Sequence, residues 1–456
     1  MASRPIAASL LTLLAILFLA GFLSSAPRVS AGTDAPAFLY TVAKQYEPLA
    51  WMDGGDRFAA GATIFVSDGT GKHPLVSEFA ASADASVSFD GRRVLFSGKR
   101  KLEEPWQIWE VALTGGVPRR VLSIPDDCVR PLYLPEDRIV YARKNGGRFV
   151  IETVDLAGGK PIALTYGPGN FLPTDVLRDG RILFAAASPM GKSNVPEIYT
   201  VYSDGSGVES YRCDHGEARR QGREMSSGDI VFAVPEGLAR FTSARAKEIP
   251  VATPAGEYAG DVVDAPSGDW IVSWKADAKA KFQLMAWAPG SKALRPLAAE
   301  AAADVVQPVL LTERAVPNRH PSGLHDWPNA NLLCLNAYTS KYKFAAGSIQ
   351  TVRVYTRNGA GEIKLLGTAP VERDGSFFVQ VPTEQPLQIE LLDASGKTLK
   401  RESGYFWMRR GEQRGCVGCH AGPETAPENA VPMTLLRSTK PADLTGASTH
   451  DVSGGH

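Results

Sequence analysis

Residues 89–96 read FDGRRVLF, a tight Asp-Gly turn that leads directly into an apolar strand. Similar segments follow at residues 135–141, 178–184, 227–232 and 267–272. Spacings of 45, 43, 48 and 40 residues separate the equivalent positions Arg93, Arg138, Arg181, Asp229 and Asp269. A repeat of this length, built from short strands and turns, is typical of β-propeller blades.

A second series of short apolar strands interleaves with the first. Its members lie at residues 63–69, 107–111, 150–154, 197–201 and, more weakly, 237–241 and 282–287. Six copies predict a six-bladed propeller over residues 37–318, with five or seven blades as alternatives. We expect a strand at residues 305–311 to complete the first blade.

The chain after the propeller changes pattern. Residues 319–330 read as a polar, Pro-rich linker that carries His320 and His325. We expect these to be solvated loop histidines, with metal or haem contact as the alternative. Residues 331–410 then predict a β-sandwich-like domain, so the fold class is mostly β. Its expected strands lie at residues 332–338, 348–355, 376–382, 386–393 and 405–408.

The stretch that carries chemistry is GEQRGCVGCH at residues 411–420, in which Cys416, Cys419 and His420 spell C-x-x-C-H. Two thiols at this spacing can bind the vinyl groups of a haem, and the adjacent histidine is the proximal iron ligand. Half of a zinc site and a redox disulfide are the alternatives. Neither a second C-x-x-C nor a thioredoxin-like context accompanies the motif. We therefore expect one covalently bound c-type haem on a segment at residues 411–437, followed by a flexible tail at residues 438–456.

Other residues are candidates for the haem site or for a further metal. Met433 lies thirteen residues after His420 and is the candidate distal ligand. Cys213 and His215 share one turn, and they are candidates for a haem-distal role or an additional metal ion. The competing interpretation is a turn with a half-buried cysteine.

The start of the chain resembles an export leader. One positive charge precedes an apolar run at residues 6–23, and small residues precede a cleavage point after Ala31. We expect a signal peptide at residues 1–31 and a periplasmic or otherwise exported protein. An uncleaved anchor helix is the alternative, and no other run is long enough to cross a membrane.

The balance of charges and the number of cysteines argue against two features, nucleic-acid binding and a disulfide framework. The 49 basic and 49 acidic residues balance, so there is no electrostatic case for binding nucleic acid. Outside the motif the cysteines are Cys128, Cys213 and Cys334. Their odd number argues against a disulfide framework, since at most one pair can form.

These features together resemble the family of hydrazine synthase alpha subunit-related proteins. The resemblance rests on the leader, the turn-rich propeller, DGSF at residues 374–377, VP at residues 381–382, and the closing GE-x-x-x-C-x-x-C-H. It implies a periplasmic c-haem protein whose haem lies between the β-domain and the propeller. The alpha subunit itself carries two c-type haems, whereas this sequence has one C-x-x-C-H. The resemblance therefore implies the architecture and the haem attachment of the family for this chain, but not hydrazine synthesis.

Two classes of function follow from these features. The first is a mono-haem c-type cytochrome-like protein in electron transfer or small-molecule redox chemistry, including a haem-dependent oxidoreductase. It implies a redox partner protein or other subunits. The alternative is a propeller that binds a partner while the haem is structural or sensory.

Overall fold

The computed structural model describes residues 37–68, 71–187, 195–212, 217–244, 246–358, 361–402, 404–418 and 429–446. All of them lie in one compact unit of the chain, Pro36–His456. Strands make up most of the regular structure, and the described helices are too short to cross a membrane. The fold is mostly β, as the sequence predicts.

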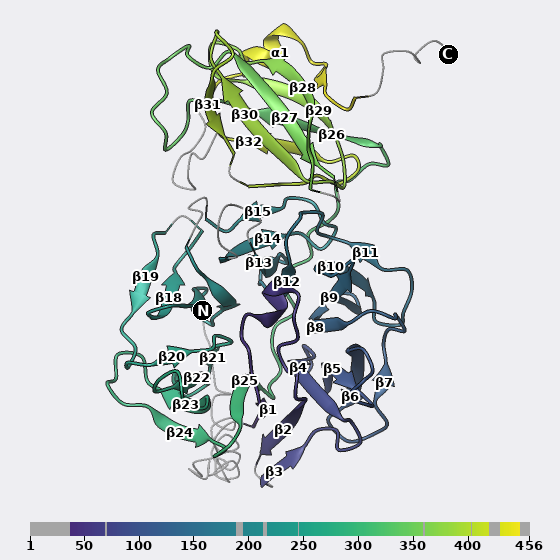
Figure 1. Cartoon of the computed structure of the whole chain (residues 1–456), viewed down its shortest axis with the longest axis vertical. Helices are drawn as coiled ribbons and strands as arrows, with labels where there is room; N and C mark the ends of the chain where they lie inside the picture. Colours follow the sequence, from purple (N-terminus) through teal and green to yellow (C-terminus); the bar gives the residue numbers. More distant parts are fainter. Residues whose placement is uncertain are drawn as a thin grey trace, which may run out of the picture. The chain divides into compact units, whose positions relative to one another are not determined.

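Six antiparallel sheets follow one another along residues 38–310 of the described chain (Figure 1). The first contains β25 (Asp304–Leu310), β1 (Phe38–Ala43), β2 (Ala62–Asp68) and β3 (Gly71–Pro74). The second contains β4 (Ala81–Val87), β5 (Arg93–Lys99), β6 (Gln107–Ala112) and β7 (Arg119–Arg120). The third contains β8 (Cys128–Leu134), β9 (Arg138–Asn145), β10 (Arg148–Asp155) and β11 (Ile162–Ala163).

The remaining three sheets repeat this arrangement. The fourth contains β12 (Phe171–Val176), β13 (Ile182–Ala187), β14 (Pro196–Val201) and β15 (Glu209–Ser210). The fifth contains β16 (Arg220–Glu224), β17 (Ile230–Val234), β18 (Gly237–Phe241) and β19 (Ile249–Val251). The sixth contains β20 (Glu257–Tyr258), β21 (Val263–Asp264), β22 (Trp270–Lys275), β23 (Gln283–Trp287) and β24 (Arg295–Ala298). Sheets of this kind are consistent with a propeller-like fold.

The two ends of the repeat meet in one sheet. Strand β25 pairs antiparallel with β1, and Val306 lies opposite Thr41. The expected strand at residues 305–311 is therefore confirmed, and it does complete the first sheet. Pairing the last strand with the first removes an exposed edge, which would otherwise invite association with other chains.

The segment between β1 and β2 fills one side of the sheet assembly with apolar side chains. It contains the short helix η1 (Ala50–Asp53), and Trp51, Met52 and Phe58 from it are buried. They pack in one cluster with inner-strand alanines and with Phe149. We call this segment, residues 44–61, the apolar plug. It also buries Arg57, whose guanidinium lies over the Trp51 ring at 4.4 Å.

Two four-stranded sheets form the β-domain that follows. One has the order β32-β26-β29-β33, and the other β28-β27-β30-β31. Strand bounds are β26 (Asn329–Cys334), β27 (Thr351–Arg357), β28 (Ile363–Pro370), β29 (Phe377–Pro382), β30 (Leu387–Leu392), β31 (Thr398–Arg401), β32 (Gln413–Cys416) and β33 (Ala442–Asp443). Alternating residues of β26, β27 and β29 are buried, as expected when one face of a sheet packs on a core. Leu332, Val352 and Val379 belong to this shared core.

The structure differs from the sequence-based expectation in the last part of the domain. Residues 405–408 do not form a strand, and Phe406 makes only a single bridge to Leu387. The reason is that Trp407 packs with the propeller-like sheets while Met408 is buried in the β-domain core. One short segment thus serves two cores and does not follow a regular strand alternation.

The expected linker and tail also need correction. Strand β26 begins at Asn329, within the expected linker. Strand β33 pairs parallel with β29, and Leu444 is only 4% exposed within the β-domain core. Residues 438–446 are therefore part of the domain and not a flexible tail, whereas residues 447–456 lie outside the described residues.

Candidate haem-attachment site

Strand β32 positions the first cysteine of the motif. It pairs parallel with β26, so Cys416 lies directly opposite Cys334. The backbone amide of Leu335 donates to the Cys416 carbonyl oxygen at 2.9 Å, which fixes the end of the strand. The Cys416 side chain is half-buried, and this burial raises the pKa of its thiol.

Gly418 brings the motif close to residues 336–339. A Cβ atom added at Gly418 would overlap the carbonyl oxygens of Thr339 and Asn336, so only glycine fits there. Gly415 differs, because a Cβ added to it would meet nothing within 4 Å. Gly418 is thus needed for close packing, while Gly415 lies within a strand. Cys419 and His420 lie outside the described residues.

Met433 is held against the same part of the β-domain. It begins the helix α1 (Met433–Arg437), and its backbone amide donates to Asp374 Oδ2 at 2.7 Å. The turn at Asp374 is in turn fixed to residues 336–339, because the Ala337 amide donates to the Gly375 carbonyl at 2.8 Å. The structure therefore anchors Met433 and Gly418 on one segment.

The Asp374 carboxylate explains why α1 begins at this place. Thr434 donates its amide to Ser376 Oγ at 3.0 Å, and Ser376 Oγ donates to Asp374 Oδ1 at 2.7 Å. Burial alone would raise the pKa of Asp374, but hydrogen bonds from Met433 and Ser376 outweigh it and hold the pKa below its usual value. The ionised carboxylate therefore accepts hydrogen bonds at the start of the helix.

Glu412 anchors the arm that leads into the motif. It is 6% exposed and accepts hydrogen bonds from the Arg409 amide at 2.7 Å and from Arg414 Nη2 at 2.6 Å. It also accepts from the Gly207 amide at 3.1 Å, in the loop between β14 and β15. This contact joins residues 205 positions apart, so the Gly-Glu pair before the motif does not by itself predict it.

Trp407 and Arg409 attach the same arm to the third and fourth sheets. Trp407 donates from Nε1 to the Leu164 carbonyl at 3.0 Å and meets Phe171 edge-on at a centroid distance of 5.4 Å. Arg409 donates to the Ala163 carbonyl at 3.1 Å and to the Tyr166 hydroxyl. The contacts of Trp407 and Arg409 thus hold the segment before the cysteine motif and limit the conformations that it can adopt.

The other candidate ligands lie elsewhere. His320 stacks on Tyr202 at a centroid distance of 3.7 Å, and His325 stacks on Trp327 at 5.0 Å. No group of three His, Cys, Asp or Glu side chains suited to a metal occurs among the described residues. Cys213 and His215 are outside that part of the chain.

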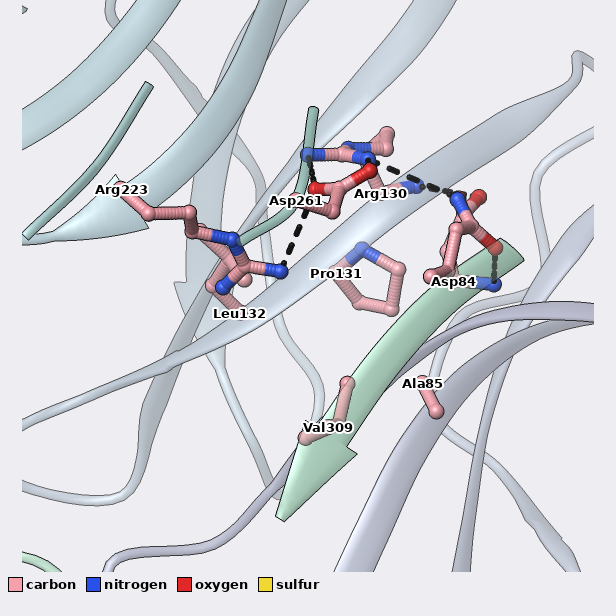
Figure 2. Close-up of a pocket in the computed structure, with 9 residues that line it drawn as sticks. Asp84, Ala85, Arg130, Pro131, Leu132, Arg223, Asp261 and Val309 are labelled. Atoms are coloured by element: carbon pink, nitrogen blue, oxygen red, sulfur yellow. Dashed lines mark hydrogen bonds and ion pairs between the residues drawn. The ribbon is translucent and has the colours of Figure 1, made fainter. Parts of the chain in front are cut away.

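A cluster of buried polar side chains forms a second candidate site, in the inner strands of the sheets (Figure 2). Arg130 pairs with both carboxylate oxygens of Asp261, at 3.3 and 3.4 Å, and Arg223 donates to Asp261 at 3.3 Å. Gln307 donates to Asp84 at 2.6 Å. We call Asp84, Arg130, Asp261 and Gln307 the central polar cluster.

The backbone explains how these side chains come together. Each inner strand is bulged or interrupted, and φ is between 54° and 58° at Asp84, Arg130, Gln221, Asp261 and Gln307. Positive φ is unfavourable for residues with a Cβ, by roughly 1–2 kcal/mol each. Because the bulge recurs in successive sheets, the cluster is a feature of the repeat.

The space around the cluster decides what it can bind. A cavity of about 10 Å³ lies among Asp84, Arg130, Asp261 and Gln307, which is room for about one water. A larger hollow of about 690 Å³ adjoins it, and its charged lining includes Arg178, Asp175, Glu224 and Asp264. The small cavity is too small for an organic substrate, whereas the larger hollow has the size of a small-molecule site.

Comparisons with known proteins agree with these observations. Residues 336–421 match the family model of the hydrazine synthase alpha subunit middle domain, and this range includes residues 336–339, Asp374 and the C-x-x-C-H motif. The fold is similar to that of Kuenenia stuttgartiensis hydrazine synthase, with a TM-score of 0.75 and 16% identity. That match covers 89% of this chain and 72% of the other.

Further matches concern other proteins with smaller scores. TolB from Acinetobacter baumannii gives a TM-score of 0.44 at 13% identity, over 61% of this chain and 67% of its own. A chain of a nidogen/laminin complex gives a TM-score of 0.45 at 12% identity, and the match covers 62% of this chain and 100% of the other. A search of curated proteins finds no match. The family-model match and the hydrazine synthase likeness together support a relation to the hydrazine synthase alpha subunit.

Proposed function

We propose that this chain is an exported protein that binds one c-type haem through Cys416 and Cys419, with His420 as the proximal ligand. The observation that carries the proposal is the placement of Cys416. It lies at the end of a fixed strand, half-exposed, where Gly418 closes against residues 336–339. The motif stands within the range that matches the alpha subunit middle domain. We infer from the leader-like residues 1–31 that attachment takes place outside the cytoplasm.

The described residues fit a covalently held haem. Cys416 lies half-buried on the edge strand β32 with its side chain against the β-domain core, and the preceding Gly415 leaves the opposite face of the strand open, since an added Cβ would meet nothing within 4 Å. Glu412 and Arg414 hold the preceding arm, so the thiol is offered from a fixed position. When bound, a c-type haem supplies one-electron redox chemistry or a site for a small molecule at iron.

The second axial position decides between these roles. We infer that Met433 is the candidate distal ligand, since α1 and Gly418 are anchored on the same segment. A Met/His pair favours electron transfer, and an open position favours small-molecule chemistry, including that of an oxidoreductase. The partner is then a redox protein or another subunit. We infer in addition that each of the six sheets is one blade of a propeller.

One measurement separates these roles. We would record optical spectra of the exported full chain, oxidised, reduced, and reduced under carbon monoxide. Electron transfer predicts that carbon monoxide leaves the wild-type spectrum unchanged and shifts that of Met433→Ala. A shift already in the wild type would instead support an accessible iron, and an unchanged Met433→Ala spectrum would contradict Met433 as ligand.

A second candidate function is partner binding by the propeller-like sheets. It is favoured by the hollow of about 690 Å³, which carries both basic and acidic side chains beside the central polar cluster. In that case the haem is structural or sensory. This alternative gains support if the protein without attached haem folds and still binds its partner with unchanged affinity.

A further inference from the structure

Two cysteines that are 82 residues apart in the sequence lie side by side in the β-domain. Strands β26 and β32 pair in parallel with Asn331 opposite Gln413 and Cys334 opposite Cys416. The register is held at both ends, because Asn331 donates its amide to the Glu412 carbonyl at 2.9 Å and Leu335 donates to the Cys416 carbonyl at 2.9 Å. No disulfide joins the described cysteines in this structure.

The pairing places both side chains within reach of each other. Neighbouring strands are about 4.8 Å apart, which lies within the Cα separation of about 4.4–6.8 Å found for disulfides. Residues opposite each other in a parallel pair point to the same face of the sheet. Cys334 belongs to the β-domain core, and Cys416 packs against that same core.

We propose that Cys334 and Cys416 form a disulfide in the protein that lacks haem, and that this disulfide withholds Cys416 from haem attachment until it is reduced. The first part depends only on the pairing of β26 with β32. The second part rests on the proposed function, since it concerns the same thiol that would bind the haem.

The chemistry balances as a thiol–disulfide exchange. Cys416 is the more exposed thiol, so its thiolate attacks the disulfide of an oxidising protein dithiol or of oxidised glutathione. One thiol of the oxidant leaves, and a mixed disulfide forms at Cys416. The Cys334 thiolate then attacks that bond and releases the second thiol. Two thiols have lost two electrons and two protons, and the oxidant disulfide has become two thiols.

The geometry predicts that this bond is easily reduced. Side chains that leave adjacent parallel strands stay about a strand spacing apart, while a disulfide needs its Cβ atoms about 3.8 Å apart. Forming the bond therefore tilts the two Cβ atoms toward each other and distorts the local backbone, and such strain favours reduction. Strand β32 lies at the edge of its sheet, so it can shift without breaking a second ladder. A labile disulfide suits a thiol that must later become available.

Peptide mapping tests the first part on the wild-type chain. The full-length protein would be made without c-haem maturation, reduced, and then oxidised with oxidised glutathione. Trypsin releases Cys334 in the peptide 320–341 and both motif cysteines in the peptide 415–437. We expect a cross-link between these two peptides. Finding only the internal Cys416–Cys419 disulfide, or only glutathione adducts, would overturn the proposal.

Two variants identify the sulfur atoms. Cys419→Ala is expected to keep the cross-link, since Cys419 does not take part in it, and Cys334→Ala is expected to abolish it. If the cross-link disappeared in Cys419→Ala, Cys334 would pair with Cys419 and not with Cys416, and the proposal would be wrong.

Haem attachment tests the second part. In a host with c-haem maturation and limiting reductant, Cys334→Ala is expected to carry a larger haem-attached fraction than the wild type. Equal fractions, with the cross-link present in the haem-free protein, would overturn the second part alone. No haem on either protein at excess reductant would count against the proposed function and would leave the disulfide result standing.

Discussion

Asp261 is the residue on which the central polar cluster depends most. It is 1% exposed and accepts hydrogen bonds from both Arg130 and Arg223. A buried guanidinium without a carboxylate partner is costly, because its charge has left water without compensation. The positive φ of Asp261 adds strain that the two arginine contacts offset. We therefore regard these two ion pairs as the contacts that join the inner strands of the third, fifth and sixth sheets.

Replacing Asp261 by Asn should destabilise the protein strongly. The variant keeps the shape of the side chain but leaves the buried Arg130 with only the more distant Asp84, at 4.0 Å, as a counter-charge, at a cost of about 3–5 kcal/mol. Urea unfolding would measure the loss. The matched control is Asp269→Asn, since Asp269 pairs with the largely exposed Arg295 at 3.1 Å and should cost less than about 1 kcal/mol. Equal losses in both variants would contradict the assignment.

The stabilisation from Asp261 should also depend on pH. Burial alone would raise the pKa of Asp261, but Arg130 and Arg223 outweigh it and hold the pKa below its usual value. A carboxyl with a lowered native pKa stabilises fully above its unfolded pKa, and the contribution disappears as the pH falls through the native pKa. The stability gap between wild type and Asp261→Asn should therefore shrink below about pH 4. A gap that widens on acidification would be inconsistent with this sign.

At the scale of elements, the arm before the cysteine motif links two parts of the fold. Trp407 reaches Leu164, Glu412 reaches Gly207, and β32 then pairs with β26. The arm is thereby fixed on both sides before Cys416 is reached. Such anchoring reduces the conformational freedom that haem attachment would otherwise have to restrict.

Gly418 offers the sharpest test of this element. Gly418→Ala would place a Cβ on the carbonyl oxygens of residues 336–339, so the loop cannot close and the attached haem fraction should fall severalfold. Gly415→Ala is the matched control, because its Cβ meets nothing within 4 Å. Haem-stained gels normalised to protein would compare the two. Equal haem content in both variants would argue against close packing at Gly418.

The strands introduced by a tight turn were predictable from the sequence, and the inner strands were not. Arg93 and Arg138 begin β5 and β9, because a tight turn and an apolar run fix both the start and the length of such strands. The turn before β5 has Gly91 at positive φ, whereas the turn before β9 has Glu136 and Asp137 there. The inner strands break their alternation at bulges such as those at Asp84 and Arg130, so their apolar period is lost. Strands β32 and β33 were missed because each is short and pairs in parallel with a distant segment.

At the scale of the whole molecule, the first and last strands of the repeat close the structure. Val306 of β25 is fully buried and packs with the apolar plug, while its strand pairs with β1. The closing strand was predictable because residues 305–311 are apolar and the first sheet lacked a strand. The contacts between Glu412, Trp407 and the sheets were not, since no local pattern encodes contacts more than 200 residues apart.

Breaking the closure should affect both ends of the repeat together. Val306→Asp would bury an unpaired carboxylate and should cost more than about 4 kcal/mol. Hydrogen exchange is expected to show that β25 and β1 lose protection at once, because they share one ladder. Val117→Asp, at a residue that is 89% exposed, is the control and should change neither strand. Loss of protection in β25 alone would show that β1 does not depend on the closure.

The measurement that most directly tests the account is the mass of the tryptic peptide 415–437 from full-length protein exported by a host with c-haem maturation. The account predicts that this peptide gains the mass of one haem, that the haem resists denaturing extraction, and that Cys416→Ala and Cys419→Ala each reduce the covalent link to a single thioether or remove it. An unmodified peptide with both cysteines present, from protein made with excess reductant, would contradict the proposal that residues 416–420 bind a c-type haem.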